Sequence, residues 1–434
     1  MHLKSERYIN NYLRIIELKT EIPKYIQRIC QLKREKTAGK LFNIVFGTWC
    51  FFDIIMRTAF KSKINAFFSN VLWDSSVNVD KWIDIAVLVL LMIIIIFLQR
   101  YSYIELFVLA IVTIPIVIGT IKSDNHYLIS MLLFVVAARY ADISKLIKIY
   151  FYILLFMIPF VILMCMGGVL PDYTLHRGGM IRHALGFEHP NRLGMRCFQL
   201  MACFCYIKKN NAHAWIKYVF MCVMTFFVYK VPNSQTAYIG IVLLMLVIMI
   251  GGLYDRYGIN KRRLMRIMAY GATIINVFTV FISFFDPKKN SLYTLIDKFM
   301  SHRFWYGYKM YDYYGVTLWG QRIDTIVKDR KYVGVYHQWY LDNAYLSVLL
   351  QFGIVVYVIF SLLLVWAVFY YANQNDYTMV AILFTYSVYG IMTTGFYMMS
   401  HNIFLLTIAS VLYMKEGTYD AKKKHRRFRI VWEI

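Results

Sequence analysis

Residues 83–99 read IDIAVLVLLMIIIIFLQ, a run in which Asp84 is the single charged residue. A membrane-spanning helix requires about 20 consecutive, mostly apolar residues, and further stretches of this chain have the same character. Over all 434 residues, 59% are apolar and 17% are charged, whereas about 25% of a soluble domain is charged. The sequence therefore predicts an all-α, polytopic membrane protein and excludes a soluble enzyme.

About 12 transmembrane helices are expected, of which the fourth, sixth and twelfth are short. Their predicted bounds are 41–60, 83–99, 104–121, 127–140, 149–169, 195–207, 214–231, 236–253, 264–285, 344–371, 378–397 and 403–414. The chain has 48 Lys and Arg against 24 Asp and Glu, a net charge of +24. With the long outer loop set aside, most of these cations lie on the inner side if both termini are cytoplasmic. Because the cations alternate with apolar runs, they favour orientation in a membrane over binding of nucleic acid.

Three regions follow from this pattern. Residues 1–40 are a basic amphipathic segment, expected to end a helix at Pro23 and to contact anionic lipid on the inner surface. A solvated tail that only sets the topology remains an alternative. Residues 41–414 form the transmembrane body, and 415–434 form a basic cytoplasmic tail.

The outer loop 170–194 reads LPDYTLHRGGMIRHALGFEHPNRLG and contains Arg177, Arg182 and Arg192. Cations on the outer side run against the usual topology, and arginines make charge-assisted contacts to phosphate. The loop's glycines allow a ligand to approach the backbone closely. The alternative is a Gly-rich turn with solvated charges, in which Pro190 merely starts the next helix.

A second outer loop, 286–342, is unusually long and rich in aromatic residues. Long loops are usually functional or disordered, and a disordered loop would be poor in aromatic residues. We therefore expect it to fold as a lid or cup, with short helices, over the membrane surface. Its last residue, Asp342, is predicted either to cap the next helix or to act as a rigidly held carboxylate. Asp53 and Asp84 are expected to lie at the membrane interface.

Motifs for soluble cofactors are missing from the sequence. There is no G-x-x-x-x-G-K-[ST] loop, no G-x-G-x-x-G fingerprint, no H-E-x-x-H and no Asp-x-Asp. We therefore expect neither a cofactor nor a metal ion.

The segment Gly186-Phe-Glu-His-Pro-Asn-Arg-Leu-Gly194, preceded by Arg182, resembles the G-F-x-H-P-N-x-x-G signature of Wzy-type polysaccharide polymerases. That family belongs to the O-antigen ligase/polymerase superfamily. The second outer loop resembles the family's catalytic loop: Ser301-His-Arg303 resembles its S-x-R start, and Trp319-Gly320 resembles its later glycine. Asp342-Asn-Ala-Tyr-Leu346, with Gly353 beyond, resembles D-N-x-Y-L…G. One departure is Ser234-Gln-Thr-Ala237, where the family often has an arginine, and Lys230 is the nearby substitute.

The resemblance implies an enzyme at the outer face of the plasma membrane. It would transfer a growing glycan from polyprenyl pyrophosphate to a new lipid-linked oligosaccharide, for a capsule, exopolysaccharide or O-antigen. Its partners would be membrane lipids and the flippase and chain-length regulator of the same pathway. The residues expected to hold the pyrophosphate are Arg182, Arg192, Arg303 and, more weakly, Arg177. Either Asp342 or His189 would remove or orient the acceptor proton. The residues expected to position substrate are Asn191, Trp305, Trp319, Tyr345 and Lys230.

Two other functions remain open. A lipid-linked saccharide flippase would suit 12 spans, but such transporters place charges at mid-span and show repeated halves, which the sequence lacks. An O-antigen ligase would resemble the polymerase, but ligases tend to carry His where this chain has Asp342. If the protein is the enzyme, Arg182 and Arg303 are expected to line one outward cavity.

Overall fold

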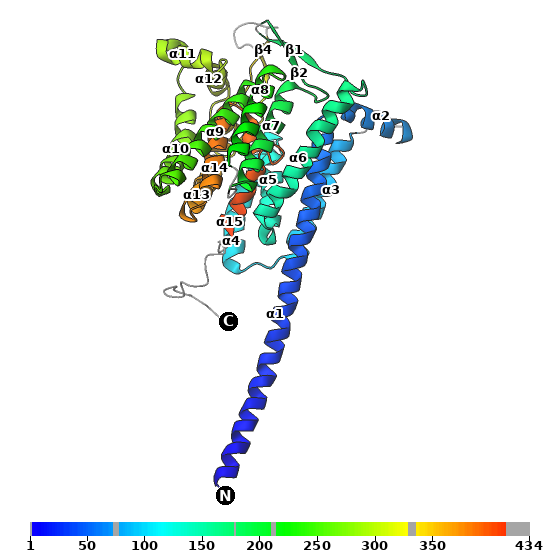
Figure 1. Ribbon diagram of the computed structural model, residues 1–434, viewed down its shortest axis with the longest axis vertical. Helices are drawn as coiled ribbons and strands as arrows, with labels where there is room; N and C mark the ends of the chain where they lie inside the picture. Colours follow the sequence, from blue (N-terminus) through cyan, green and yellow to red (C-terminus); the bar gives the residue numbers. More distant parts are fainter. Residues whose placement is uncertain (1, 73–77, 178, 210–213, 329–335, 414–434) are drawn as a thin grey trace.

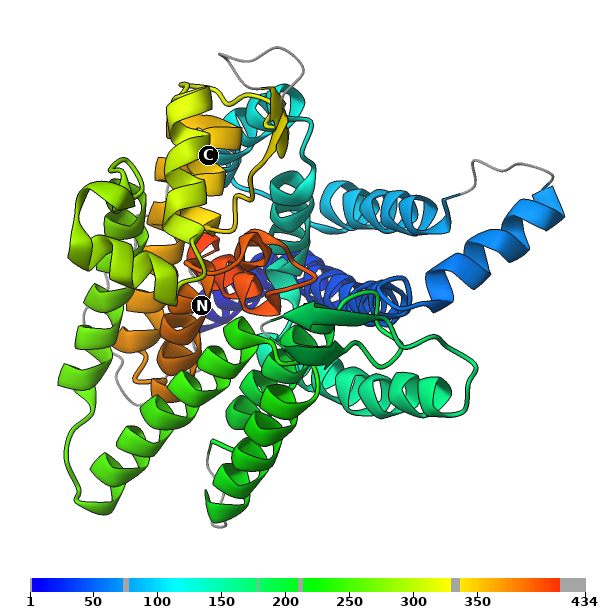
Figure 2. The same cartoon turned by 90° about the horizontal axis from the view of Figure 1, so that it is seen from above.

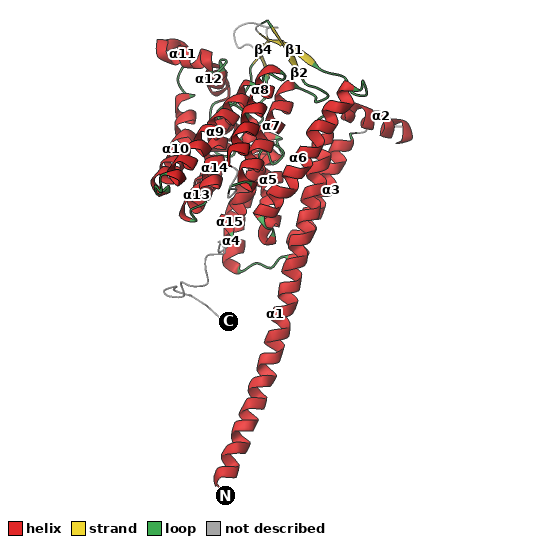
Figure 3. Cartoon of the chain, viewed as in Figure 1, coloured by secondary structure: helices red, strands yellow, loops and turns green. Residues whose placement is uncertain are grey.

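The computed structural model describes residues 2–72, 78–177, 179–209, 214–328 and 336–413. The predicted tail, 415–434, lies outside the described residues. The protein is a helical bundle with one long helix that projects from it (Figures 1 and 3). Among the described residues, seven helices are long and apolar enough to span a membrane. The predicted class, a helical membrane protein, is therefore confirmed, whereas the number of spans and the orientation stay predictions.

The projecting helix is α1, which runs without interruption over His2–Ile55. The predicted break at Pro23 is wrong, and the N-terminal segment continues the axis of α1 instead of bending away from it (Figure 1). Proline usually interrupts a helix, but strong helix formers such as Glu, Lys, Arg and Leu occur on both sides of Pro23. The candidate span on α1 falls within Ile29–Ile55 and overlaps the predicted span 41–60.

Most of the remaining helices match the predicted spans to within several residues. Their bounds are α2 Phe60–Leu72, α3 Val79–Ile93 with a π-helical end Ile94–Leu98, α4 Tyr103–Ser123, α5 Tyr127–Ala137, α6 Ile143–Met166, α7 Pro190–Ile207, α8 Ala214–Lys230, α9 Gln235–Arg256, α10 Arg262–Ile282, α11 Ser291–Phe299, α12 Arg303–Tyr314, α13 Ala344–Asn373, α14 Tyr377–Gly390 and α15 Ile408–Leu412. The helix over Phe60–Leu72 was not predicted, and those over Ser291–Phe299 and Arg303–Tyr314 are short helices of the long loop, as expected. Four 3₁₀-helices lie at Ala138–Tyr140, Pro287–Lys289, Thr394–Tyr397 and Ile403–Thr407.

Two short antiparallel hairpins were not predicted. The first pairs β1 Thr174–Arg177 with β2 Met180–His183, and the second pairs β3 Ile326–Lys328 with β4 Tyr336–Gln338. Both belong to the outer loops, and with α11 and α12 they form the end of the molecule opposite the projecting part of α1 (Figure 1). These strands are only three or four residues long, which is too short for a clear alternating pattern of apolar residues.

The core is built around α7, which packs against α6, α9 and α8. From Leu193 to Cys205 it is almost completely buried. Elsewhere α10 packs against α13 and α14, and α13 packs against α4. Seen from above, the segment that contains the last two 3₁₀-helices lies near the centre, between the helices of the N-terminal half and those of the C-terminal half (Figure 2).

At the end from which α1 projects, basic side chains pair with groups on other elements. Arg139 lies 2.7 Å from Glu105, Lys209 lies 2.8 Å from Asp376, and Arg34 donates a hydrogen bond to the Phe97 carbonyl. Cations concentrated at one end are typical of the cytoplasmic side of membrane proteins. This supports the prediction that the hairpins and α12 face outward.

Candidate functional site at the outer end

Arg182 fixes the first outer loop. It lies on β2 opposite Leu175 and is 5% exposed. Its Nε donates to the Pro232 carbonyl at 3.0 Å, and its Nη2 donates to Oδ1 of Asn191. Arg182 therefore joins the hairpin, the start of α7 and the turn between α8 and α9. Burial and the neighbouring Arg177 both lower its pKa from the ordinary value.

At two positions of the G-F-x-H-P-N-x-x-G segment, Gly186 and Gly194, the structure disfavours any residue larger than glycine. Gly186 has φ +87°, a left-handed conformation that favours glycine, and its carbonyl accepts from the Ala59 amide at 2.9 Å. A Cβ on Gly194 would lie 2.5 Å from Cβ of Ser234, so a side chain there would push α7 away from the α8–α9 turn. Pro190 begins α7, as predicted. The segment thus fixes how the outer loop enters the bundle.

The structure gives His189 a role at the start of α7. As the N-cap residue, it accepts a hydrogen bond from the Asn191 amide on Nδ1 at 3.0 Å. A ring nitrogen that accepts an N–H carries no proton, so the neutral ring has its proton on Nε2. Burial and the cations Arg182 and Arg192 lower the pKa of His189. In this tautomer Nε2 donates a hydrogen bond and does not take up a proton, which argues against His189 as the base.

Arg303, the first residue of α12, brings the second outer loop to the same place. Its Nη2 lies 3.2 Å from Oγ1 of Thr236, and its Nε lies 3.3 Å from Oδ2 of Asp342. The preceding residues, Ser301 and His302, both have left-handed backbone angles, with φ of 57° and 62°. This unusual pair of residues turns the chain sharply between α11 and α12.

Asp342 is not the cap of α13. Asn343 is the N-cap residue, and its Oδ1 accepts from the amides of Tyr345 at 3.0 Å and Leu346 at 3.3 Å. The capping prediction for Asp342 is therefore wrong by one residue. Its carboxylate pairs with Arg303 instead, and its side chain is 45% exposed while that of Arg303 is 14% exposed.

A chain of polar contacts connects Arg177 to this pair. Nη2 of Arg177 donates to Oγ of Ser301 at 2.7 Å, and Ser301 in turn donates to Oε1 of Gln235 at 3.2 Å. Gln235 lies in the turn where the resemblance leads one to expect an arginine. Arg177 of the hairpin therefore reaches the neighbourhood of that missing cation through Ser301, which precedes Arg303 by two residues.

A pocket of about 390 Å³ opens beside Arg303. It is lined by Met180, Tyr229, Asn233, Ser234, Gln235, Tyr238, Ile239, Phe299, Met300, Arg303 and Met392. Arg182 is not among the residues that line it, so the two arginines do not share this cavity as expected. They share a scaffold instead, because Arg182 bonds to Pro232 and Arg303 to Thr236 of the same turn.

Several residues expected at the site lie elsewhere. Tyr345 is 1% exposed, and its hydroxyl donates to the Ser387 carbonyl at 2.9 Å, so it fixes α13 to α14. Lys230 is exposed and lies over the ring of Tyr229, and Arg192 lies 3.4 Å from Glu188. Trp305 lies on α12 beneath Lys288, whose Nζ is 4.7 Å from the ring centroid.

Trp319 belongs to a loop that docks onto a kink in α13. Gly353 there has φ +91°, and a Cβ on it would lie 2.5 Å from the Gly320 nitrogen. The Ile354 amide donates to Thr317 and the Gln321 amide donates to the Gln351 carbonyl. In a membrane protein, backbone groups released by a kink require such partners. The two glycines singled out in the sequence therefore contact each other.

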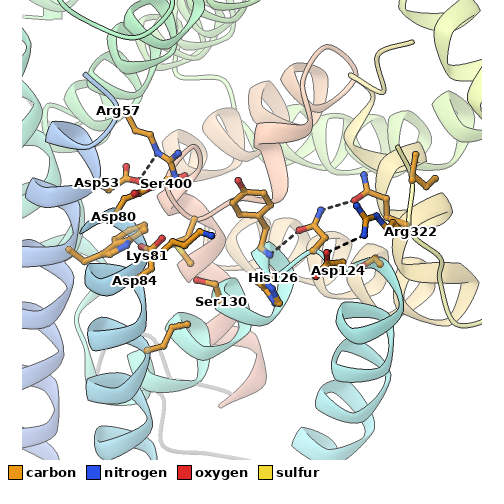
Figure 4. A pocket seen from close by; sticks show the side chains of 18 of the residues that line it. Asp53, Arg57, Asp80, Lys81, Asp84, Asp124, His126, Ser130, Arg322 and Ser400 are labelled. Atoms are coloured by element: carbon orange, nitrogen blue, oxygen red, sulfur yellow. Dashed lines mark hydrogen bonds and ion pairs between the residues drawn. The ribbon is translucent and has the colours of Figure 1, made fainter. Parts of the chain in front are cut away.

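A second, larger cavity of about 560 Å³ was missed by the sequence reasoning (Figure 4). Asp53, Asp80 and Asp84 lie on one side, and the pair Asp124–Arg322, with a distance of 3.8 Å, lies on the other. Asp53 is 9% exposed and lies inside the bundle, two residues before the end of α1. Its position at the membrane interface stays a prediction. The sequence feature that indicates this cavity is the presence of aspartates within predicted spans, since acidic residues are uncommon there.

Arg196 of α7 holds Asp53 beneath this cavity. Its Nη2 lies 2.6 Å from Oδ2 of Asp53, and its Nη1 donates to Tyr150 at 2.8 Å and to the Ser400 carbonyl at 2.8 Å. Arg196 is 1% exposed. Its place in the predicted span 195–207 did not indicate Asp53 as its partner.

Among the described residues, no three His, Cys, Asp or Glu side chains are arranged to hold a metal ion. The candidate site at the end that carries the hairpins is the cation–carboxylate pair Arg303–Asp342, of which Arg303 lines a mainly apolar pocket and Asp342 does not. Comparison with known proteins gives no relative: no family model, no curated protein and no solved structure matches this chain.

Proposed function

We propose that this protein is an integral-membrane glycosyltransferase that polymerises oligosaccharide repeat units carried on polyprenyl pyrophosphate, at the outer face of the plasma membrane. The observation that carries this proposal is the Arg303–Asp342 pair, 3.3 Å apart, of which Arg303 lines the pocket of about 390 Å³. The reaction needs a cation for the departing pyrophosphate and a base for the acceptor hydroxyl. This pair supplies one of each.

In the proposed step, the acceptor oxygen attacks the anomeric carbon of the growing chain. The bond from that carbon to the pyrophosphate oxygen breaks, and the pyrophosphate leaves with the electron pair. The hydroxyl proton passes to the Asp342 carboxylate. Arg303 stabilises the charge on the pyrophosphate. Arg177, which donates a hydrogen bond to Ser301, two positions before Arg303, is the second cation. Phosphate and carboxylate are both good partners for guanidinium, so a bound pyrophosphate competes for Arg303 and frees Asp342.

The other predicted residues support the site rather than react. Arg182 and Asn191 hold the hairpin to the α8–α9 turn. His189 caps α7 and presents an Nε2–H, which suits donation to a phosphate or sugar oxygen. The donor already carries its own activated leaving group, so the reaction requires no metal ion.

The test is turnover of a purified lipid-linked repeat unit by the protein in vesicles, with product size measured by gel electrophoresis. A ladder of products on one lipid carrier is expected, and it should persist in the presence of a chelator. Transfer of a finished chain to a different acceptor would assign the protein as a ligase. Movement of the lipid-linked unit across the vesicle membrane without new glycosidic bonds would assign it as a flippase.

A further inference from the structure

A groove leads from Arg303 down the membrane face of α8 and α9. The pocket beside Arg303 contains Tyr229 and Tyr238 in its wall, and both also line a second pocket of about 270 Å³. Their rings are 5.6 Å apart, centroid to centroid. The second pocket is completed by Cys222, Thr225, Phe226 and Met245. The two pockets are therefore neighbours that share a wall.

The direction of the groove follows from helix geometry. On α8 its residues are Cys222, Thr225, Phe226 and Tyr229, spaced as one face of a helix. Tyr229 to Cys222 and Tyr238 to Met245 each span seven residues, so the groove descends about 10 Å along α8 and α9 at 1.5 Å per residue. α8 lies at the periphery of the bundle (Figure 2), and its Phe226 is 65% exposed. This surface faces lipid in a membrane.

The chemistry of the groove changes along its length. Arg303 and the polar turn residues lie at its outer end, whereas the lower part is lined by aromatic, thioether and thiol side chains. Three methionines, Met180, Met300 and Met392, line the pocket beside Arg303, and methionine adapts to irregular apolar chains. A cation at one end and an apolar channel at the other match a molecule with an anionic head and one long hydrocarbon tail.

We propose that the isoprenoid tail of a lipid pyrophosphate lies in this α8–α9 groove while its pyrophosphate lies at Arg303. This inference rests on the proposed function and adds the binding path of the lipid carrier. A membrane phospholipid has the same general chemistry, but the proposed reaction requires a pyrophosphate at Arg303, which lines the outer end of the groove. The isoprenoid pyrophosphate is therefore the occupant to which the inference commits.

The test is photolabelling of the full-length protein in nanodiscs with a benzophenone-bearing prenyl pyrophosphate, followed by mapping of the labelled peptides. We expect label on α8 and α9, displaced by geranylgeranyl pyrophosphate but not by geranylgeraniol or by inorganic pyrophosphate at the same concentration. Label elsewhere, or displacement by phosphatidylglycerol as efficient as by the prenyl pyrophosphate, overturns the proposal.

Variants make the test specific. Thr225→Trp fills the groove and should weaken labelling about tenfold or more, because excluding even two methylene groups has an effect of that size. Met245→Trp, on the opposite wall, should act in the same way. The matched control is Val223→Trp on α8, which is 58% exposed and lines neither pocket, and it should label like the parent.

The outcome is separable from that of the proposed reaction. If the Thr225 and Met245 variants elute as the parent does but label normally, the groove proposal fails whatever the turnover. If labelling follows the expected pattern but no polymer forms from a lipid-linked repeat unit, the groove stands and the polymerase proposal fails.

Discussion

Two of the Arg–Asp pairs among the described residues, Arg196–Asp53 and Arg303–Asp342, differ in their surroundings. Arg196 and Asp53 lie 2.6 Å apart inside the bundle, with side chains 1% and 6% exposed. Arg303 and Asp342 lie 3.3 Å apart at the outer end, with side chains 14% and 45% exposed. Arg196 also bonds to Tyr150, Gln199 and the Ser400 carbonyl. The buried pair is fixed by its neighbours, whereas the outer pair is open to a competing anion.

This difference shows that an Arg–Asp pair can stabilise the fold when it is buried, or remain available to a ligand when it is exposed. A buried ion pair loses its hydration and is stable only when every partner is present. A pair at a rim contributes little to stability, so its partners are able to exchange. Substitution in the buried pair should therefore lower stability, whereas substitution in the outer pair should lower turnover.

The largest expected effect is on turnover, at Asp342. Asp342→Asn keeps the size of the side chain but removes the base, so the rate should fall about 10²–10⁴-fold, the usual contribution of general acid–base catalysis. The thermal unfolding midpoint should stay near that of the parent, since Asn343 and not Asp342 caps α13. The check is polymerisation of a lipid-linked repeat unit. An Asn variant that polymerises at the parental rate would show that Asp342 is not the base.

The next effect is on stability, at the buried pair. Arg196→Gln leaves the buried Asp53 with Arg57, 3.5 Å away, as its remaining ion-pair partner. Loss of the closer partner should destabilise the fold by up to about 3–5 kcal/mol. The measurement is the unfolding midpoint in detergent. As a control, the double variant Arg196→Gln, Asp53→Asn should recover part of the loss because the buried carboxylate charge is removed as well. A double variant less stable than the single one would contradict the ion-pair explanation.

A smaller effect is expected on turnover when the two outer arginines are compared. Arg303→Gln should reduce the rate about 10–100-fold, the equivalent of one charged hydrogen bond to the pyrophosphate. Arg182→Gln should instead lower the unfolding midpoint, because it removes bonds to Pro232 and Asn191. Equal losses of rate at unchanged stability in both variants would mean that Arg182 also contacts the substrate.

The smallest effect is a pH dependence of stability through His189. Burial and two nearby arginines lower its pKa below the ordinary 6.5, so the folded protein takes up a proton less readily than the unfolded chain. The capping contribution, about 0.5–2 kcal/mol, is therefore fully present above pH 6.5 and is lost as the pH falls through the lower, folded value. Unfolding midpoints between pH 8 and pH 5 test this. His189→Asn retains a capping side chain that does not titrate, and it should remove this part of the pH dependence.

Some of the site residues predicted in the outer loops lie together in the structure, and others do not. The sequence pointed to Arg303, Asp342 and Arg177, which the structure connects through Ser301 and the α8–α9 turn. It also pointed to Tyr345, which is buried in the core. A sequence motif marks a residue but not the direction of its side chain. At the start of α13, Asn343 is the cap, whereas the carboxylate of the preceding Asp342 pairs with Arg303.

The sequence by itself determined that this chain is a helical membrane protein and where most of its helices lie, because the hydrophobic length of a span is a local property. Charge along the chain favoured one orientation for the same reason. The tertiary structure alone decided that Arg196 pairs with Asp53 across 143 positions and that Gly320 meets Gly353. It also decided that Arg182 and Arg303 share a turn but not a pocket. These are non-local contacts, set by how helices and loops pack together, and no local pattern specifies them.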